Sequence, residues 1–293
     1  MLSPRQKGLS LIILSAIAFG WMPIFGVWAY GSEQGGVNTQ GLLLIRFSIA
    51  ALVMLAVMCW RRGQWPRGRV LLGLVAMGGV GYVGQAFSYF SALQYGSAAL
   101  AALLLYLYPV IVTLASACWF KEKLTRRTMA ALLLACISLL LTIGPAGGQL
   151  SGVIFGLLAA LIYSAYILAG SRLTPQTGAL PAATVVMVSA ALSLWLTTLW
   201  HQPSWPIGAH SWAATIAIAL ISTVIAIFSF LAGLDYLSAS EASTLSTLEP
   251  VVSVLLAALI LGEHLSLLQW IGGAGILLSA LLIALSPAIP APE

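Results

Sequence analysis

The chain contains very few charged residues. Asp, Glu, Lys and Arg make up 6% of its 293 residues, whereas a soluble domain carries roughly 25% charge. A soluble fold would be unable to cover its surface with so few charges, so this class of protein is excluded. The small excess of basic residues gives a net charge of +5. We interpret it as a membrane-orientation signal, and no nucleic-acid partner is expected.

Candidate metal ligands and catalytic groups are also scarce. The 3 His and 3 Cys residues are spread along the chain, at His201, His210, His264, Cys59, Cys118 and Cys136. The cysteines have no paired spacing, and HExxH, GxSxG and Walker A sequences are absent. We therefore expect no metal site, no cofactor, no coupling to ATP within this chain and no enzymatic activity.

One nucleotide-like motif is present, but in the wrong context. Residues 79–84 read Gly-Val-Gly-Tyr-Val-Gly and satisfy GxGxxG. The dinucleotide fingerprint needs a strand, a turn and a helix, followed by an acidic residue, and this context does not fit the middle of an apolar run. We interpret these glycines as positions of close helix packing or as a pliable wall beside a cavity.

Long apolar runs dominate the sequence, and 61% of its residues are hydrophobic. Each run is about 20 residues long, the length that a helix rising about 1.5 Å per residue needs to cross ~30 Å of hydrocarbon. Helices are expected because lipid offers no partner to an unpaired backbone amide. We predict an all-α integral membrane protein with ten transmembrane helices, at 8–30, 38–60, 70–91, 97–119, 127–144, 151–171, 181–200, 211–234, 239–262 and 267–286.

Basic residues lie in alternate gaps between these runs. With a cytoplasmic N-terminus, eleven of the 12 Lys and Arg residues fall in the N-terminal tail and in the connections after helices 2, 4, 6 and 8. They are Arg5, Lys7, Arg61, Arg62, Arg67, Arg69, Lys121, Lys123, Arg126, Arg127 and Arg172. The other connections hold none, and Arg46 lies inside a run. Because short cytoplasmic loops are enriched in Lys and Arg, both termini are predicted to be cytoplasmic.

The second half of the chain repeats the first. Residues 93–142 align without gaps on residues 234–283, with about 16 identities in 50 positions. The repeat unit is five helices, so we divide the chain into a first repeat at 1–150 and a second at 151–293. An odd number of helices inserts the second copy upside down. Inverted repeats are the architecture of secondary transporters, which bind substrate near the middle of the membrane.

The repeated blocks resemble a known family. The block at 92–124 contains the sequences ALQY, PV and KEKL, and the block at 234–265 contains LEPV and LGEHL. Together with Trp270-Ile271-Gly272, they resemble the paired signatures of the EamA type within the drug/metabolite transporter superfamily. The resemblance covers nearly the whole chain. It implies a bacterial inner-membrane exporter of small metabolites, and the chain is most similar to the amino-acid exporters, including those for aromatic amino acids.

Two charged residues lie near the middle of their predicted helices, Arg46 in the second and Glu249 in the ninth. One hypothesis makes Arg46 an anchor for a substrate carboxylate, and Glu249 a site for an ammonium group or a proton. The alternative pairs the two residues, or ties each to backbone carbonyls, as a structural link between helices. Both interpretations stay open at this stage.

Aromatic and amide side chains supply further candidate substrate contacts. They are Trp21, Tyr82, Gln85, Tyr89, Tyr106, Tyr163 and Tyr166. Tyr82, Gln85 and Tyr89 share one face of the third predicted helix, while Tyr163 and Tyr166 lie on the sixth. Such residues would line a central cavity of amphipathic character. The alternative for each tyrosine is helix packing or the aromatic belt at the membrane surface.

Pro109 and Pro250 are repeat partners within the fourth and ninth predicted helices. Each proline frees a backbone carbonyl and gives its helix a flexible point. We predict that they are hinges for alternating access, and the alternative is that they are plain kinks.

The sequence therefore predicts a secondary transporter that exports amino acids, including aromatic and apolar ones, or similar small metabolites across the bacterial inner membrane by alternating access. Export of another metabolite or of a drug is the alternative. A polytopic enzyme acting on lipid is a second alternative, although it would need clustered His, Asp or Cys at an interface. The expected partners are a small-molecule substrate and the lipid bilayer, and no oligomeric state is predicted.

Overall fold

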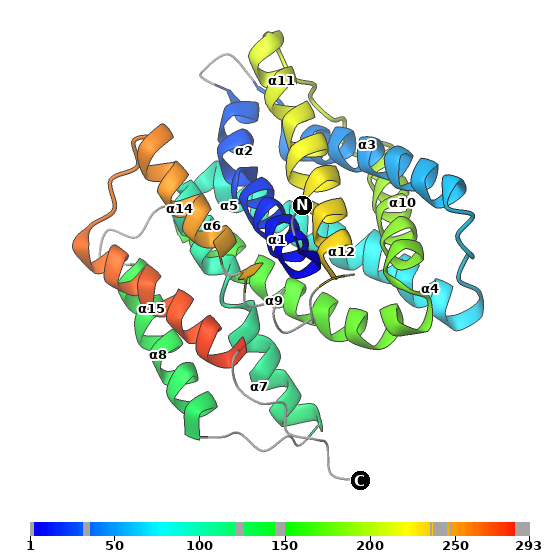
Figure 1. Cartoon of the computed structure of the whole chain (residues 1–293). Coiled ribbons are helices and arrows are strands. Elements are labelled where there is room, and N and C mark those ends of the chain that lie inside the picture. The colour runs from blue at the N-terminus through cyan, green and yellow to red at the C-terminus, as the bar shows by residue number, and fades with distance from the viewer. Residues whose placement is uncertain are drawn as a thin grey trace.

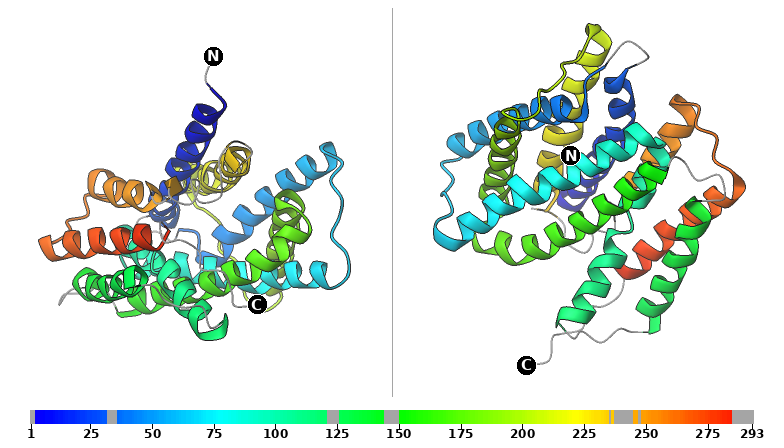
Figure 2. Two further views of the ribbon diagram at one scale, coloured as in Figure 1. Left: turned by 60° about the horizontal axis from the view of Figure 1, so that its bottom comes forward. Right: turned by 180° about the vertical axis from the view of Figure 1, so that it is seen from behind.

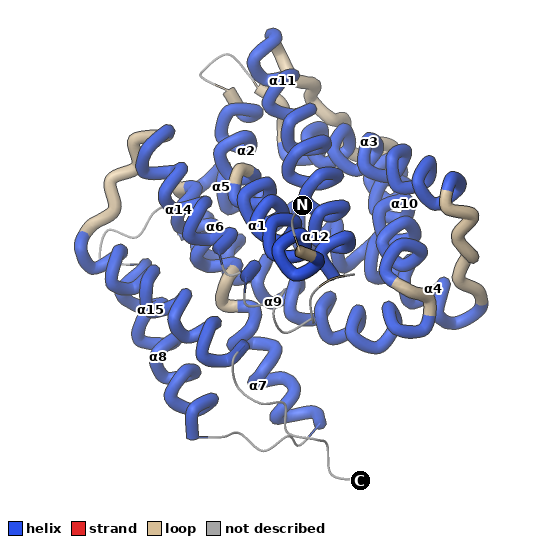
Figure 3. The backbone as a smooth tube through the Cα atoms, viewed as in Figure 1, coloured by secondary structure: helices blue, strands red, loops and turns tan. Residues whose placement is uncertain are grey.

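A computed structural model of the chain describes residues 3–31, 36–120, 126–143, 150–234, 236, 245–246 and 248–284. Regular secondary structure in these ranges is helical throughout (Figures 1 and 3). Six helical segments are long and apolar enough to cross a membrane. They are Pro4–Tyr30, Thr39–Trp60, Gly68–Tyr95, Leu150–Gln176, Ala179–Thr197 and Gly208–Phe230. The structure is thus that of an all-helical integral membrane protein.

Four shorter apolar helices accompany these six. They are Ala98–Val112, Met129–Leu141, Leu248–Ile260 and Leu267–Ser279. Each of these ten segments overlaps one of the predicted apolar runs. The ninth run is predicted to begin at 239, and residues 239–244 lie outside the described ranges.

The first half of the chain forms eight α-helices and one π-helical segment. They are α1 (Pro4–Gly20), α2 (Met22–Tyr30), α3 (Thr39–Trp60), α4 (Gly68–Ala76), η1 (Met77–Tyr82), α5 (Val83–Tyr95), α6 (Ala98–Leu105), α7 (Tyr108–Phe120) and α8 (Arg126–Ile143). Side-chain caps start three of them, at Ser3 for α1, Asn38 for α3 and Ser97 for α6. Asn38 Oδ1 accepts from the Gly41 amide at 2.8 Å, and Ser97 Oγ accepts from the Leu100 amide at 3.1 Å.

The second half is described from α9 onward. Its elements are α9 (Leu150–Leu173), the 3₁₀ turn η2 (Thr174–Gln176), α10 (Ala179–Thr197), α11 (Gly208–Ala219), the π-helical segment η3 (Leu220–Ile225), α12 (Ala226–Leu234), α14 (Leu248–Ile260) and α15 (Leu267–Ala284). The helix formed by α4, η1 and α5 and the helix formed by α11, η3 and α12 therefore each contain a π-helical segment.

Two predicted spans are broken in the middle. The first span is interrupted at Trp21, between the end of α1 and the start of α2. Pro23 occupies the first turn of α2, where its missing N–H costs no helical hydrogen bond. The fourth leaves helical geometry at Tyr106 and Leu107, directly before Pro109 in the first turn of α7. Pro250 likewise lies in the first turn of α14. Pro109 thus follows a break in its predicted span, and Pro250 is the third residue of α14.

The helices pack in pairs that are far apart in the sequence. α15 packs along α8, α10 along α3, α5 along α9 and α1 along α12. Figures 1 and 2 show α8 and α15 side by side with α7 at one edge of the molecule. Phe47 and Phe90 are fully buried, within a core that extends over both halves of the chain.

Glycine allows η1 to approach α10 closely. A Cβ at Gly78 would overlap the Ser189 hydroxyl and the Val186 carbonyl, and a Cβ at Gly79 would lie 2.5 Å from Ser193 Oγ. Side chains at these two positions would force the helices apart, which agrees with the predicted role of close packing. A Cβ at Gly81 would lie 3.7 Å from its nearest neighbour, so close packing at this position does not require glycine.

Candidate functional site

Arg46 on α3 is almost completely buried, with 2% of its surface exposed. Its Nε donates to Thr223 Oγ1 at 2.9 Å, and its Nη2 donates to the Tyr82 hydroxyl at 3.2 Å. The guanidinium carbon lies 5.6 Å from the centroid of the Phe90 ring, which is a cation–π distance. A buried guanidinium held by neutral groups keeps its full charge.

The hypothesis that Arg46 pairs directly with Glu249 does not match the structure. Among the described residues, Arg46 has hydroxyl and aromatic partners and forms no ion pair. Two side-chain hydroxyls hold the guanidinium where the hypothesis placed a carboxylate. Among the described residues, the guanidinium is therefore a buried positive charge with no carboxylate in contact with it.

Both hydrogen-bond partners of Arg46 come from π-helical segments. Tyr82 ends η1, and Thr223 lies within η3. The Thr223 hydroxyl donates its hydrogen to the carbonyl of Ile218, five residues earlier, at 3.0 Å, so its oxygen is left to accept from Arg46. Such π-helical insertions are frequent at functional sites. Here they place two hydroxyls from different halves of the chain against one guanidinium.

A series of tyrosine rings leads away from Arg46. This tyrosine ladder consists of Tyr82, Tyr166, Tyr163, Tyr108 and Tyr106, in spatial order. Successive ring centroids are 5.6, 6.0, 4.7 and 5.9 Å apart. These distances are typical of favourable aromatic pairs. Four of the five side chains keep part of their surface exposed, and Tyr106 is buried. Part of the ladder is therefore accessible from outside the buried core.

Glu249 lies at the other end of the ladder. It is partly exposed and stands in the first turn of α14, where the positive end of the helix dipole favours a carboxylate. The Tyr106 hydroxyl donates to the Ser246 carbonyl at 3.3 Å and interacts electrostatically with the Glu249 carboxylate. Tyr89 interacts electrostatically with both Glu249 and Arg46, so this ring is near both charges.

The structure brings most of the predicted site residues together. Tyr82, Tyr106, Tyr163 and Tyr166 belong to the ladder, and Tyr89 is buried beside it against Phe90. Gln85 is buried about one turn after Tyr82. Trp21 belongs to a different group, because its ring stacks on Phe25 at 5.2 Å and lies 6.3 Å from Trp28.

Thr223 is a site residue that sequence reasoning missed, although the repeat contains a signal for it. The aligned blocks are offset by 141 positions, since 234 − 93 = 141. The same offset pairs Tyr82 with Thr223, since 223 − 82 = 141, and Tyr108 with Glu249, since 249 − 108 = 141.

The second repeated glutamate, Glu263, caps a helix of the first half. Its Oε1 accepts from the Ala98 amide at 2.7 Å, and its Oε2 accepts from the Ala99 amide at 3.1 Å. A carboxylate at a helix N-terminus satisfies unpaired amides and complements the helix dipole. The contact fixes the connection between α14 and α15 against the start of α6. Its repeat partner Glu122 lies outside the described residues.

Replacing Glu263 by Ala is expected to destabilise the folded protein by about 1.5–3 kcal/mol, because two backbone amides lose a charged acceptor. Glu263→Gln should cost less, since one amide oxygen still accepts a hydrogen bond. The midpoint of thermal unfolding of the purified protein in detergent measures the effect. His264→Ala, at the exposed neighbouring position, is the matched control and should leave the midpoint unchanged. Equal midpoints for all variants would show that the cap does not contribute to stability.

Comparison with known proteins identifies the class to which this arrangement belongs. The model of the EamA-like transporter family matches residues 6–144 and again residues 150–285. The chain therefore belongs to the EamA-like transporter family. It is a multi-pass protein of the bacterial inner membrane.

Individual relatives match over most of their length. A transporter of uncharacterized function from Archaeoglobus fulgidus is 30% identical over 94% of this chain and 96% of its own. An inner membrane transporter from Salmonella typhimurium, also uncharacterized, is 27% identical over 96% of both chains. A protein from Ancylobacter novellus named as an aromatic amino acid exporter is 28% identical over 77% of this chain and 80% of its own.

A solved crystal structure has the same fold. It superimposes with a TM-score of 0.64 and 25% sequence identity, over 94% of this chain and 95% of the other. The helical arrangement is therefore shared along nearly the whole length of both proteins.

Proposed function

We propose that the protein exports amino acids, including aromatic and large apolar ones, by alternating access. The observation that carries this proposal is the tyrosine ladder with Arg46 at one end and Glu249 at the other. An amino acid carries a carboxylate and an ammonium group on one carbon, together with a side chain of variable size. The site presents a cation, an anion and aromatic surface between them.

The proposed site contains a binding partner for the carboxylate, the ammonium group and the side chain of an amino acid. The planar guanidinium of Arg46 is suited to bidentate contact with a carboxylate, and its two bonds to hydroxyls leave further N–H groups to donate. Glu249 accepts from an ammonium group. The exposed faces of Tyr163 and Tyr166 offer apolar contact to an aromatic side chain. The exporter from Ancylobacter novellus supports the same class of substrate.

We further propose that ten helices form two inverted repeats, 1–150 and 151–293, with both termini in the cytoplasm. The pattern of helix contacts supports a twofold relation. Under it, α8 exchanges with α15 and α3 with α10, and both of these pairs are in contact. The same exchange maps the contact of α5 with α9 onto that of α12 with α1, which is also present. The family model also matches the chain twice.

Contacts between predicted outer connections support the proposed orientation. The Asn38 amide donates to Ser204 Oγ at 2.7 Å, and both residues belong to connections that the basic residues assign to the outside. The Glu263 cap joins two other outer connections. Pro109 and Pro250 would act as hinges, because each stands in the first turn of a helix beside the ladder or Glu249.

The orientation predicts that positions 64 and 202 lie on opposite sides of the membrane. In a variant without the native cysteines, Gln64→Cys should react with a membrane-impermeant maleimide only after the cells are opened. Gln202→Cys should react in intact cells. Both positions are exposed, so lack of reaction is not explained by burial. Reaction of both variants in intact cells would contradict the inverted topology.

Counterflow in proteoliposomes tests the transport proposal. Vesicles loaded with unlabelled phenylalanine should accumulate labelled phenylalanine from the outside, and vesicles without protein should not. A panel of unlabelled amino acids should compete, with the large apolar ones competing most strongly. Repeating the assay at two pH gradients measures coupling to protons. Absence of counterflow with the amino-acid panel, but uptake of another metabolite or a drug, would favour the alternative substrates.

A further inference from the structure

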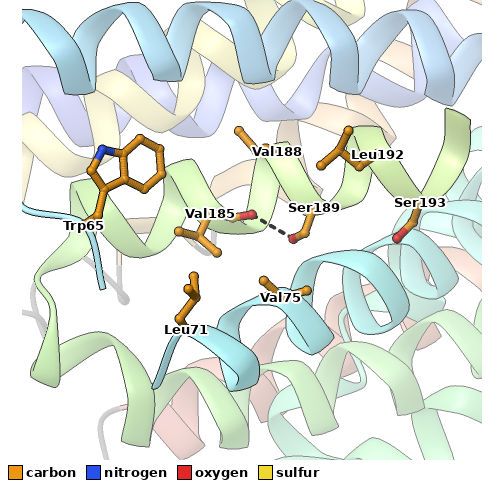
Figure 4. Close-up of a pocket in the computed structure, with 8 residues that line it drawn as sticks. All are labelled: Trp65, Leu71, Val75, Val185, Val188, Ser189, Leu192 and Ser193. Atoms are coloured by element: carbon orange, nitrogen blue, oxygen red, sulfur yellow. Dashed lines mark hydrogen bonds between the residues drawn. The ribbon is translucent and has the colours of Figure 1, made fainter. Parts of the chain in front are cut away.

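An open groove lies between α4 of the first half of the chain and α10 of the second half. Its volume is about 240 Å³. It is lined by Trp65, Leu71, Val75, Val185, Val188, Ser189, Leu192 and Ser193. Figure 4 shows Leu71 and Val75 facing α10, with Trp65 at one end of the groove. None of these residues belongs to the tyrosine ladder.

The interior of the groove is mostly apolar and offers few hydrogen-bonding groups to a bound molecule. Ser189 Oγ bonds to its own helix, at 2.7 Å from the Val185 carbonyl oxygen, so its hydrogen is already used. Leu72 on α4 and Leu192 on α10 are 69% and 64% exposed, and in a membrane-spanning segment such side chains face hydrocarbon. The groove therefore opens toward lipid rather than toward water.

Two arginines lie in the sequence between the groove residues Trp65 and Leu71. Arg67 and Arg69 are exposed, and they precede the groove residue Leu71 by four and two positions in the sequence. Residues 61–75 contain four Arg and no acidic residue. In the proposed orientation, this segment lies at the cytoplasmic surface, where anionic lipid headgroups are concentrated. Trp65 stands at headgroup level, as interfacial tryptophans do.

We propose that this groove binds one molecule of an anionic phospholipid from the cytoplasmic leaflet. One acyl chain lies along α10 against Leu71 and Val75, and the phosphate is held by Arg67 and Arg69. The close contact at Gly78 and Gly79 closes the bottom of the groove and sets how far the acyl chain enters. Charge complementarity selects an anionic headgroup over a zwitterionic one, because an isolated cluster of arginines attracts net negative charge. This lipid site is separate from the proposed transport site.

Native mass spectrometry of the detergent-purified protein provides the test, with phosphatidylglycerol and phosphatidylcholine of identical acyl chains as probes. The wild-type protein should retain phosphatidylglycerol, with an apparent affinity about tenfold or more above that for phosphatidylcholine. The double variant Arg67→Gln/Arg69→Gln should lose this preference. The double variant Arg5→Gln/Lys7→Gln removes the same charge from the N-terminal tail and should keep it.

A photoactivatable acyl chain on phosphatidylglycerol locates the bound lipid. Crosslinks should fall within α4 and α10, and Val188→Trp, which fills the groove, should remove them. Equal loss of preference in both charge variants would overturn the headgroup assignment, because net charge alone would then explain the binding. Crosslinks elsewhere on the molecule would overturn the groove assignment. If Val188→Trp fails to fold, the crosslink position in the wild type still decides the question.

Discussion

Arg46→Gln is expected to lower the initial rate of amino-acid counterflow about a hundredfold or more. The guanidinium is the positive charge of the proposed site, and its two charge-assisted bonds to a substrate carboxylate each contribute about 1.5–3 kcal/mol. Each tenfold change in rate or affinity corresponds to about 1.4 kcal/mol. Arg46→Lys should be affected less, because it keeps the charge but loses the planar fork. Initial rates in proteoliposomes containing equal amounts of folded protein measure the effect.

The contacts of Arg46 supply the control for this experiment. Thr223→Val removes the acceptor of one guanidinium hydrogen bond and keeps the charge, so its counterflow rate should fall by less than tenfold. Since Arg46 has no anionic partner in the described structure, its removal leaves no unpaired carboxylate behind. The Arg46→Gln protein should therefore elute as a folded species in size-exclusion chromatography. Normal counterflow in this variant would remove Arg46 from the transport site, and loss of folded protein would indicate a structural role.

Glu249→Gln is expected to reduce amino-acid counterflow about ten- to hundredfold, because the ammonium group of the substrate loses a charged acceptor. The substitution preserves the shape of the side chain and its capacity to accept from the Tyr106 hydroxyl. Folding should therefore be preserved. Tyr106→Phe removes the neighbouring hydroxyl alone and is the matched control, with a smaller effect on transport.

Counterflow also separates the two roles considered for Glu249. If this residue binds the substrate ammonium group, exchange of substrate is impaired even without a pH gradient. If it carries a coupled proton, exchange persists and only accumulation driven by a pH gradient is lost. We expect the first result. Unchanged exchange together with lost accumulation would assign the residue to proton coupling instead.

The sequence predicted the helix positions well, because each membrane-spanning helix needs a long apolar run and turn-forming residues separate the runs. It also placed Arg46 inside a membrane-spanning helix, where the structure has it buried within α3. Hydrophobic periodicity carried less information about contacts, since both the lipid-facing and the packed faces of such helices are apolar. The group formed by Trp21 with Phe25 could not be separated from the tyrosine ladder for this reason.

The environment of Arg46 was not predictable from local sequence. Its partner Thr223 is 177 residues away, and the π-helical segment that presents it has no distinctive composition. Predicting a buried charge pair was reasonable because a charge inside a membrane protein usually has a partner. The structure shows instead that hydroxyls and aromatic rings surround this guanidinium.

The two repeats carry different residues at matching positions, and this difference bears on how many substrate molecules one chain can bind. Tyr108 and Glu249 are related by the same offset that relates Tyr82 to Thr223. A duplicated scaffold could in principle carry two equivalent binding sites, one per copy. Here the carboxylate occurs in only one copy, and both hydroxyls converge on a single arginine. The proposed transport site is therefore single and polarised, and we expect a titration to saturate with one substrate per chain, bound in a single orientation.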